Sequence, residues 1–324
     1  MKTLTVGKIR ALQQCTSDRG TFTCLALDHR QNLRKALSQG NSGSVSDEDL
    51  TNFKLQVTRI LAGEATAVLL DPQYSAAQAI SSGVIPRKTG LVVAVESTGY
   101  GGEATARQSE ILPGWSVAKA KRMGANMIKL LVYYHPNSPT AAEIEGFVKQ
   151  VALECQTEDM GLMLEPLSYS LDPSKNSLDS KEKRFVVVET ARRLVVPGVD
   201  VLKAEFPLDP MVDREESVWA DACTEISKAS PIPWILLSAA VDYELFLRQV
   251  SVACQAGASG IAVGRAVWKE SVLMQGIERE AFLADTGRQR LSRLTALCKA
   301  LAKPWQDFYS LPAIPMDWYT TYAE

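Results

Sequence analysis

Apolar runs of strand length recur along the chain, and segments with a helical pattern separate them. The runs are rich in Val, Ile and Leu and do not alternate cleanly with polar residues, which is typical of strands buried on both faces of a parallel sheet. The pattern predicts eight such strands, over residues 21–28, 66–71, 91–96, 127–134, 161–167, 199–206, 233–238 and 259–264.

The segments between these runs have the amphipathic pattern of surface helices. The clearest one begins after Ser46, a favourable N-cap residue followed by acidic residues, and closes on Gly63. Similar patterns predict further helices over residues 115–125, 140–156, 183–195, 212–229 and 242–258.

Strands and helices alternate without a linker or a shift in composition, which predicts an α/β fold with a single (β/α)8 TIM barrel spanning residues 1–324. A doubly wound open sheet is the alternative, but no G-x-G-x-x-G follows the first strand, which argues against a dinucleotide-binding fold. Residues 39–47 and 172–183 predict polar loops, either lids or solvated connections. Residues 304–324, rich in Pro and aromatic residues, predict a C-terminal extension packed along its own barrel or a neighbouring subunit.

Composition narrows the class of protein. Apolar residues make up 46% of the chain and charged residues 22%, as in ordinary globular proteins, and the net charge is -2 without a block of like charges. Nucleic acid and membrane surfaces are therefore not expected as partners, whereas a homo-oligomer is possible.

The first thirty residues lack the pattern of a secretory signal, and the six cysteines are scattered without a C-x-x-C motif. We expect a cytoplasmic protein with reduced core cysteines.

Candidate chemistry lies where polar residues interrupt or end the predicted strands, because the carboxyl ends of barrel strands carry the active site. These positions bring two lysines and several carboxylates to one mouth. They are Asp28, His29, Asp71, Glu96, Lys129, Glu165, Lys203, Glu205, Ser238, Gly264 and Arg265.

Lys203 stands in the middle of the apolar run "VDVLKAEF". Burial of an unpaired ammonium costs several kcal/mol or lowers its pKa toward neutrality, and a neutral amine is a nucleophile. A second cation, Lys129, acts in the same direction, so the pair predicts imine chemistry with a carbonyl substrate. The alternative is a pair of buried salt bridges, for instance Lys203 with Glu165 and Lys129 with Asp28. Glu205 is a further candidate partner of Lys203 before substrate binds.

Carbon–carbon cleavage through an imine also needs a proton relay and groups that hold the substrate. Glu165 is positioned to protonate the carbinolamine hydroxyl and then to take a proton from the substrate hydroxyl. Asp28 is expected to bind substrate hydroxyls and to tune Lys129.

A phosphate site is predicted after the last two strands, where barrels commonly hold phosphate with backbone N–H groups. Ser238 and Ala239 follow one strand, and Gly264 and Arg265 follow the other. His29 and Arg30 are candidate contacts for the distal end of the substrate, whether it carries phosphate, sulfonate or neither.

Two alternatives remain. A metal-dependent lyase would use His29 and His135 with Glu96 or Asp71, but "YYHPN" places His135 in a turn and zinc sites usually need three good ligands. A regulator that binds sugar phosphate without turnover is the second alternative. The leading interpretation needs no metal and no cofactor.

Several motifs together resemble the class I tagatose-1,6-bisphosphate aldolase family, which also includes the related sulfofructosephosphate aldolases. The similarity runs in order over roughly residues 20 to 305. The motifs are "LALDHRQNLRKAL", "VLLDPQYS", "ESTGYGG", "WSVAKAKRMGANMIKLLVYY", "DVLKAEFP", "LLSAAVDYELF" and "VGRAVWKESV".

The resemblance implies a metal-free barrel aldolase that cleaves a ketose bisphosphate, most simply tagatose 1,6-bisphosphate, to dihydroxyacetone phosphate and glyceraldehyde 3-phosphate. Fructose bisphosphate and sulfofructose phosphate are the alternative substrates. The resemblance assigns the imine to Lys203. It places the other catalytic and phosphate-binding roles on Lys129, Glu165, Asp28, Ser238, Gly264 and Arg265.

One departure from the family concerns the first strand. Where tagatose enzymes usually read D-Q-R, this chain has Asp28-His29-Arg30. The contact with the sugar hydroxyls therefore differs from the family pattern, which bears on the identity of the substrate.

Overall fold

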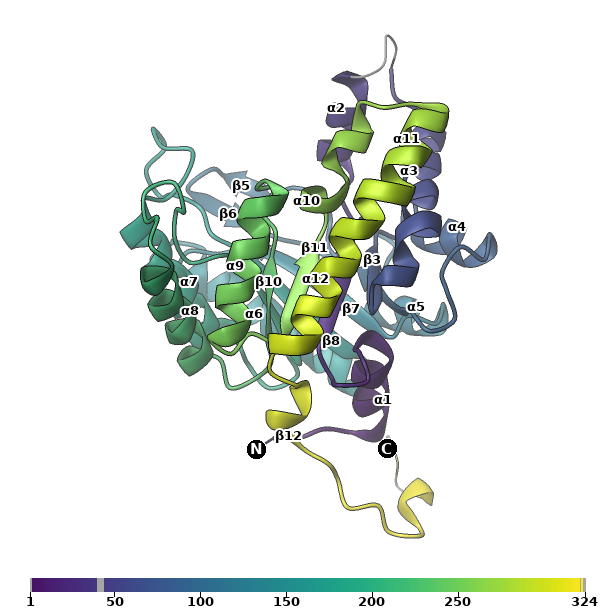
Figure 1. Cartoon of the computed structure of the whole chain (residues 1–324). Coiled ribbons are helices and arrows are strands. Elements are labelled where there is room, and N and C mark those ends of the chain that lie inside the picture. The colour runs from purple at the N-terminus through teal and green to yellow at the C-terminus, as the bar shows by residue number, and fades with distance from the viewer. Residues whose placement is uncertain (1, 40–43, 321, 323–324) are drawn as a thin grey trace.

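The computed structural model describes residues 2–39, 44–320 and 322. In this part of the chain, eight parallel strands close into a barrel with helices around it, which confirms the predicted fold (Figure 1). Each observed strand lies within, or within one residue of, its predicted run. In spatial order the strands are β10 (Trp234–Leu237), β11 (Gly260–Val263), β2 (Phe22–Ala26), β3 (Ala67–Leu70), β4 (Gly90–Ala94), β7 (Met127–Tyr133), β8 (Gly161–Leu167) and β9 (Val201–Ala204).

The predicted helices are present, and the first begins as its sequence requires. The Ser46 hydroxyl accepts the Asp49 backbone N–H at 3.1 Å, and the Asp49 carboxylate accepts the Ser46 N–H at 2.9 Å, which completes a capping box. These helices are α3 (Asp47–Leu61), α5 (Val117–Arg122), α6 (Ala141–Thr157), α7 (Ser180–Leu194), α8 (Glu216–Ala229) and α9 (Tyr243–Gln255).

Other helical segments did not figure in the sequence prediction. They are α1 (Val6–Cys15), α2 (Gln31–Gln39), α4 (Ala76–Ser81), α10 (Arg265–Trp268), α11 (Gly276–Phe282) and α12 (Arg288–Leu301). Short single-turn segments, η1 (Ala62–Glu64), η2 (Lys269–Val272), η3 (Leu283–Gly287), η4 (Trp305–Asp307) and η5 (Trp318–Thr320), complete the list.

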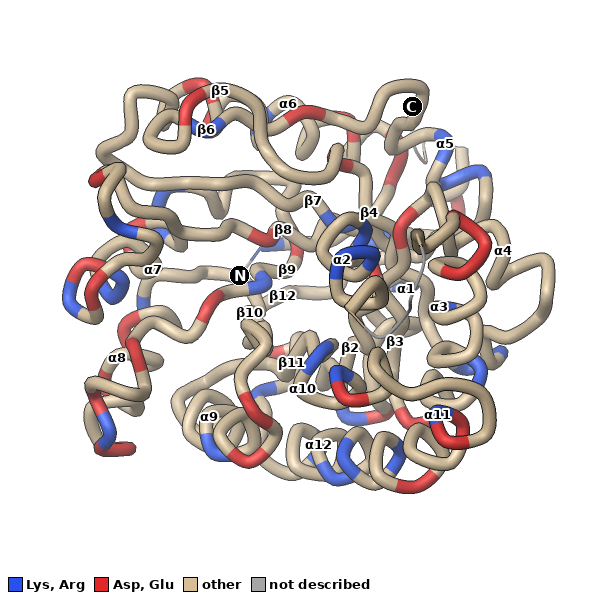
Figure 2. The backbone as a smooth tube through the Cα atoms, turned by 90° about the horizontal axis from the view of Figure 1, so that it is seen from above, with Lys and Arg blue, Asp and Glu red and all other residues tan. Residues whose placement is uncertain are grey.

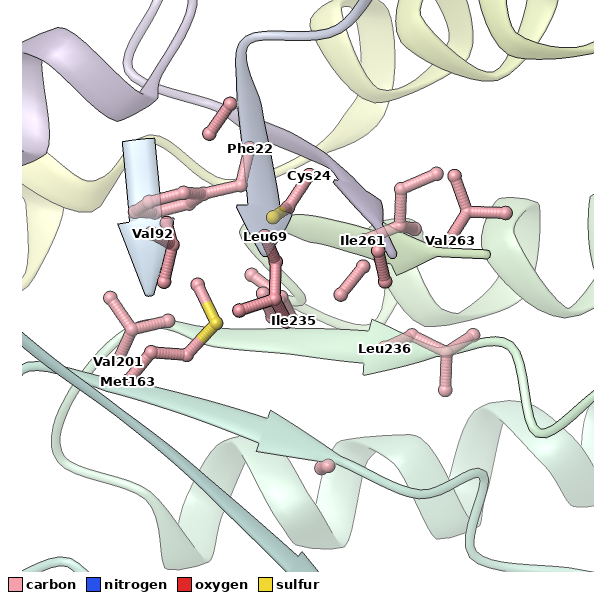
Figure 3. Packing of buried hydrophobic residues seen from close by; sticks show 14 of the residues in the cluster. Phe22, Cys24, Leu69, Val92, Met163, Val201, Ile235, Leu236, Ile261 and Val263 are labelled. Carbon is pink, nitrogen blue, oxygen red and sulfur yellow. The ribbon is translucent and has the colours of Figure 1, made fainter. Parts of the chain in front are cut away.

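Apolar side chains from the strands fill the barrel interior. Leu69, Met163, Val201 and Ile235 lie in the space that the strands enclose (Figure 3), and all four are fully buried. Strands buried on both faces need apolar residues at successive positions, which explains the runs in the sequence. Among the described residues, no helix combines the length and the apolar character needed to cross a membrane.

The two ends of the barrel differ. Figure 1 places both termini at one end, and α2, α10 and the hairpin of β5 (Gly101–Glu103) and β6 (Ala106–Gln108) at the other. Of the predicted loop 39–47, residues 40–43 lie outside the described residues. The connection over 172–183 leads into α7, whose N-cap Asp179 accepts the Glu182 N–H at 2.9 Å.

The C-terminal extension packs against the end of the barrel that carries the termini. Its strand β12 (Tyr309–Ser310) pairs in parallel with β1 (Lys2–Thr3), and Trp305 beside it is buried. The Tyr309 hydroxyl donates to the backbone carbonyl of Asp200 at 2.7 Å. The first and last parts of the chain therefore meet beneath the barrel.

A buried ion pair lies beside this contact. The Lys8 ammonium donates to the Asp200 carboxylate at 2.8 Å and to the Gly198 carbonyl at 3.1 Å, and the same Asp200 oxygen accepts the Leu162 N–H at 2.9 Å. Lys8 is 4% exposed and Asp200 is fully buried, and this burial raises the pKa of Asp200. The pair links α1 to the start of β9 and to β8.

We expect the Lys8→Met variant to lose about 3–5 kcal/mol of unfolding free energy, because it leaves a buried carboxylate without its cation. In the wild type Lys8 lowers the pKa of Asp200 against the larger effect of burial, so that pKa should rise further in the variant; the buried acid then takes up a proton more readily, and the loss should be smaller at pH 5 than at pH 8. Urea unfolding at both pH values measures it. The exposed Lys88→Met is the control, and equal stability of the two variants would refute the role of the pair.

Candidate active site

A cavity of about 670 Å³ opens at the carboxyl ends of the barrel strands. The carboxyl ends of parallel strands meet at one face, so residues far apart in sequence converge there. Every residue to which the sequence gave a catalytic or substrate-binding role lines this cavity: Asp28, His29, Arg30, Lys129, Glu165, Lys203, Ser238, Ala239, Gly264 and Arg265. Asp71, also expected at this mouth, does not line it.

Lys129, in β7, is the centre of a buried ionic network. Its ammonium lies 2.6 Å from Glu96 Oε1, 2.7 Å from Asp28 Oδ2 and 3.3 Å from Glu165 Oε2. The side chain is 1% exposed. Burial alone lowers the pKa of a lysine, but the three carboxylates outweigh this effect and raise the pKa of Lys129 well above its ordinary value. Lys129 therefore remains a cation at neutral pH.

Asp28 follows β2 and faces two ammonium groups. Burial by itself raises the pKa of a carboxyl group, but Lys129 and then Lys203 outweigh it and hold the pKa of Asp28 well below its usual range. Asp28 is therefore a carboxylate throughout the neutral range, and it can accept hydrogen bonds from substrate hydroxyls.

Lys203, in β9, reaches the same network from the neighbouring side. Its ammonium lies 2.7 Å from Glu165 Oε1. Glu165 thus bridges the two lysines, and its other oxygen, Oε2, has no hydrogen-bond partner in the described part of the chain. The sequence interpretation placed Lys203 in apolar surroundings; the structure gives it a carboxylate partner. Both salt bridges of the alternative interpretation, to Glu165 and from Lys129 to Asp28, are present in one site.

The expected pairing of Glu205 with Lys203 is wrong. Glu205 lies just beyond β9, and its Oε2 accepts the Ser168 backbone N–H at 2.6 Å. This bond draws the carboxylate toward the chain after β8, although Glu205 still lines the cavity.

Glu96 belongs to the network but was assigned from sequence only to the metal alternative. Its Oε1 contacts Lys129, and its Oε2 accepts the Leu131 N–H at 3.1 Å. The sequence contains an indication of this role, because Glu96 comes just after its strand, as Asp28 comes just after β2. What the sequence did not show was that both carboxylates would reach the same ammonium.

Arg30 is largely occupied by protein groups. It is 4% exposed, and it donates to Gln73 Oε1 at 2.9 Å and to the backbone carbonyl of Glu96 at 2.7 Å. Its guanidinium also lies 3.6 Å from Glu96 Oε1. The structure therefore uses Arg30 to fix the chain after β4, which leaves it few free donors for a substrate.

His29 is neutral at physiological pH. Burial lowers the pKa of His29 to about 4, against the opposing effect of Asp28 and with a smaller contribution from Arg265. Its ring meets the Trp268 ring edge-on at a centroid distance of 5.6 Å, and its Nδ1 has no hydrogen-bond partner among the described residues. His29 can therefore exchange a hydrogen bond with a sugar hydroxyl but does not supply a positive charge.

The turns after β10 and β11 meet at one side of the cavity. The Ser238 hydroxyl accepts the Gly264 N–H at 3.4 Å, and Ala239 adopts a left-handed φ of 41°. Left-handed backbone costs a non-glycine residue about 1–3 kcal/mol and is common at ligand-binding turns. A Cβ at Gly264 would lie 2.8 Å from the carbonyl oxygen of Ala26, so the close approach of these strands requires glycine. Burial lowers the pKa of the adjacent Arg265.

The sequence matches the family model described as DeoC/LacD family aldolase over residues 22–270. The chain belongs to this aldolase family. It is 30% identical to a tagatose 1,6-diphosphate aldolase of Listeria monocytogenes, over 95% of this chain and 96% of the relative. It is 32% identical to tagatose 1,6-diphosphate aldolase 2 of Enterococcus faecalis, over 94% and 97%. These matches confirm the resemblance seen in the sequence.

Solved structures share the fold of this aldolase. A fructose-bisphosphate aldolase from Plasmodium falciparum superimposes with a TM-score of 0.73 at 13% identity, covering 93% of this chain and 98% of that one. A Schiff-base-forming fructose-1,6-bisphosphate aldolase gives a TM-score of 0.60 at 19% identity, covering 90% and 99%. The chain is thus an aldolase, a carbon–carbon lyase, built on a TIM barrel.

The residues suggested for a metal site do not come together in this aldolase. Asp71 pairs with the buried Lys54 and accepts the Ser75 hydroxyl at 2.7 Å. His135 accepts the Asn137 N–H at 3.1 Å, and neither Asp71 nor His135 lines the cavity. In the described ranges, no group of three or more His, Cys, Asp or Glu side chains is arranged to hold a metal ion.

Proposed function

We propose that this aldolase is of class I and cleaves tagatose 1,6-bisphosphate to dihydroxyacetone phosphate and glyceraldehyde 3-phosphate, with Lys203 as the imine-forming residue. The observation that carries the proposal is the position of the Lys203 amine at the cavity, 2.7 Å from a carboxylate that can exchange its proton. The names of the curated relatives, which are tagatose 1,6-diphosphate aldolases, support the choice of substrate.

Imine formation begins when Glu165 takes a proton from the Lys203 ammonium. The freed amine adds to the C2 carbonyl of the ketose, and Glu165 returns the proton to the carbinolamine hydroxyl, which leaves as water. The product is a protonated imine between Lys203 and the substrate. The short contact between the two side chains allows this transfer without an intervening group.

Cleavage then uses the imine as an electron sink. A carboxylate takes the proton of the C4 hydroxyl, the C3–C4 bond breaks, and its electron pair moves into the imine to give an enamine and a free aldehyde. Glu165 is suited to this role because its Oε2 accepts no hydrogen bond among the described residues and has only the Lys129 ammonium near it, at 3.3 Å. Protonation of the enamine and hydrolysis then release dihydroxyacetone phosphate and regenerate Lys203.

Lys129 and Asp28 hold the substrate during these steps. Lys129 stays protonated, so it donates to substrate oxygens and keeps Asp28, Glu96 and Glu165 close together. Asp28 stays ionised and accepts from sugar hydroxyls. Such fixed partners favour the reacting geometry over free solution.

The C1 phosphate of the ketose lies, in this proposal, at the turns after β10 and β11. Ser238 and Ala239 supply a hydroxyl and backbone, Gly264 permits close approach, and Arg265 supplies a guanidinium. No hydrogen bond or ion pair occupies the Arg265 guanidinium within the described residues, so its donors are free for an anion.

Borohydride reduction tests the proposal. We expect the protein, incubated with dihydroxyacetone phosphate and borohydride in the presence of chelator, to gain one reduced adduct on Lys203 by peptide mass spectrometry. Lys203→Met is the control and should gain none. An unmodified Lys203, or an adduct on another lysine alone, would contradict the mechanism.

A further inference from the structure

Two arginines near the mouth of the barrel, Arg265 and Arg107, have no carboxylate partner within 4 Å in the described part of the chain. The buried ionic network around Lys129, called the inner network below, is balanced in charge without these two arginines. Its three carboxylates, Asp28, Glu96 and Glu165, already face three cations, Lys129, Lys203 and Arg30. The two outer arginines therefore represent positive charge that the protein itself leaves unpaired.

Arg107 is held by aromatic rings. Its guanidinium carbon lies 4.3 Å from the centroid of the Tyr100 ring, 4.6 Å from that of Tyr169 and 5.1 Å from that of Tyr133. Ring contacts of this kind use the faces of the guanidinium and leave its in-plane N–H groups available. Its Nε donates to the Ala104 carbonyl at 3.0 Å, whereas Nη1 and Nη2 have no acceptor among the described residues.

The rings connect Arg107 to the active site. Tyr100 and Tyr133 both line the cavity that holds Lys203. Tyr133 is the last residue of β7, the strand that carries Lys129, and Tyr100 follows β4. Arg107 is not among the residues that line the cavity, but its guanidinium contacts the rings of two residues that do.

This wall is opposite the turns assigned to the C1 phosphate. In the closed order of strands, β7 is four places from β11, and β4 is four places from β10, so each pair spans the barrel. Seen from above, the β5–β6 hairpin and α10, which begins at Arg265, lie on opposite sides of the barrel (Figure 2). The two unpaired arginines therefore belong to segments on opposite sides of the barrel mouth.

We propose that Arg107 binds the tetrahedral anionic group at the aldehyde end of the substrate and so determines the preference for substrates with two anionic ends. This inference rests on the proposed function, because it takes cleavage at Lys203 as given. A ketose bisphosphate held at C1 by one side of the barrel carries its other phosphate toward the opposite side. Arg30 is engaged by Gln73 and Glu96, whereas the described residues give Arg107 no carboxylate partner, so Arg107 is available for this group. Phosphate and sulfonate share the required oxyanion geometry.

The test compares substrates with and without the distal anion. Arg107→Ala should lower kcat/KM for tagatose 1,6-bisphosphate about 10- to 100-fold, mainly through KM, and for tagatose 1-phosphate by less than about 3-fold. Arg107→Lys should keep part of the preference, because it retains the charge but not the planar fork. The 1-phosphate of 6-deoxy-6-sulfofructose, assayed in parallel, shows whether phosphate or sulfonate is preferred at this end.

Equal losses on both tagatose substrates, or no loss on either, would overturn the role of Arg107, since a purely structural effect does not depend on the distal group. The exposed Arg122→Ala is the matched control and should leave both values unchanged. Trapping with dihydroxyacetone phosphate, which lacks the distal end of the substrate, distinguishes a failure of the proposed function from a failure of the role assigned to Arg107. If the wild-type protein traps the adduct but Arg107→Ala keeps the wild-type preference, only the assignment of Arg107 fails; if the wild type traps none, the proposed function fails.

Discussion

The Lys203→Met variant is expected to lose kcat/KM for tagatose 1,6-bisphosphate by a factor of about 10⁴ to 10⁶, the usual scale for removing a covalent nucleophile. Methionine fills a similar volume but cannot form an imine. The carboxylate of Glu165 keeps its contact with Lys129 at 3.3 Å, so the inner network retains a cation. An assay that couples dihydroxyacetone phosphate to reduction by NADH measures the loss.

Lys203→Arg provides the matched control for charge. The guanidinium preserves an ion pair with Glu165 but does not add to a carbonyl, so this variant should be as inactive as the methionine variant. Thermal unfolding of both variants shows whether the fold is intact. Retention of more than about one hundredth of wild-type activity by a folded variant of either kind would sink the assignment of the nucleophile.

The Lys129→Met variant should be the most destabilised of the site variants, by about 3–5 kcal/mol, because three buried carboxylates would lose their common cation. Activity should also fall at least about 100-fold, since Asp28 and Glu165 would move apart and lose their geometry. Chemical denaturation and the coupled assay measure the two effects on the same sample.

The pH dependence distinguishes this explanation from simple loss of packing. In the wild type, the raised pKa of Lys129 gives stability that is present below its unfolded pKa of about 10.4 and lost as the pH rises through the folded value. The lowered pKa of Asp28 gives stability that is lost only as the pH falls through its folded value, below about 4. The contribution of the Lys129–Asp28 pair is therefore insensitive to pH between these limits. In Lys129→Met, Asp28 loses the cation that contributes most to lowering its pKa against the effect of burial, so it is protonated more readily and the deficit should shrink from pH 8 to pH 5.

A double variant sharpens the comparison. Adding Glu96→Gln to Lys129→Met removes one of the crowded charges and should restore part of the lost stability, although each single change destabilises the protein. Additive losses in the double variant, together with a deficit that does not change with pH, would contradict the electrostatic role of Lys129.

The fold was predictable because its signal is local. A strand buried on both faces must be apolar at nearly every position. The sequence shows such runs directly, and the run over residues 161–167 coincides with β8. Helix α12 was not predicted, although its sequence carries the pattern of a helix. Its buried residues Leu291, Leu294 and Cys298 repeat at helical spacing.

The pairing inside the site was less predictable because it depends on register between strands. Leu131, two residues after Lys129, is the register partner of Glu165 in β8, and Glu96 lies beyond the end of β4. Sequence spacing does not show which carboxylate reaches which ammonium across these strands. It placed the charged residues at one mouth but did not reveal that Lys129 would hold three carboxylates.

Arg107 was invisible to the sequence for a related reason. It lies in a short polar hairpin, outside the buried strands of the barrel whose ends carry the predicted site residues. Its significance comes from Tyr100, Tyr133 and Tyr169, which surround it from three separate segments. Only a folded chain brings these rings around one guanidinium.

The pairing of β1 with β12 has a consequence for the order of folding. Lys2 is the register partner of Tyr309, so this contact joins residues near the two ends of the chain. During synthesis, β1 cannot form this pair until residues 309–310 have left the ribosome. Contacts of such long sequence separation carry a high entropic cost of loop closure and form late. We therefore expect the pairing of β1 with β12 to form after the strands that carry Lys129 and Lys203 have been made.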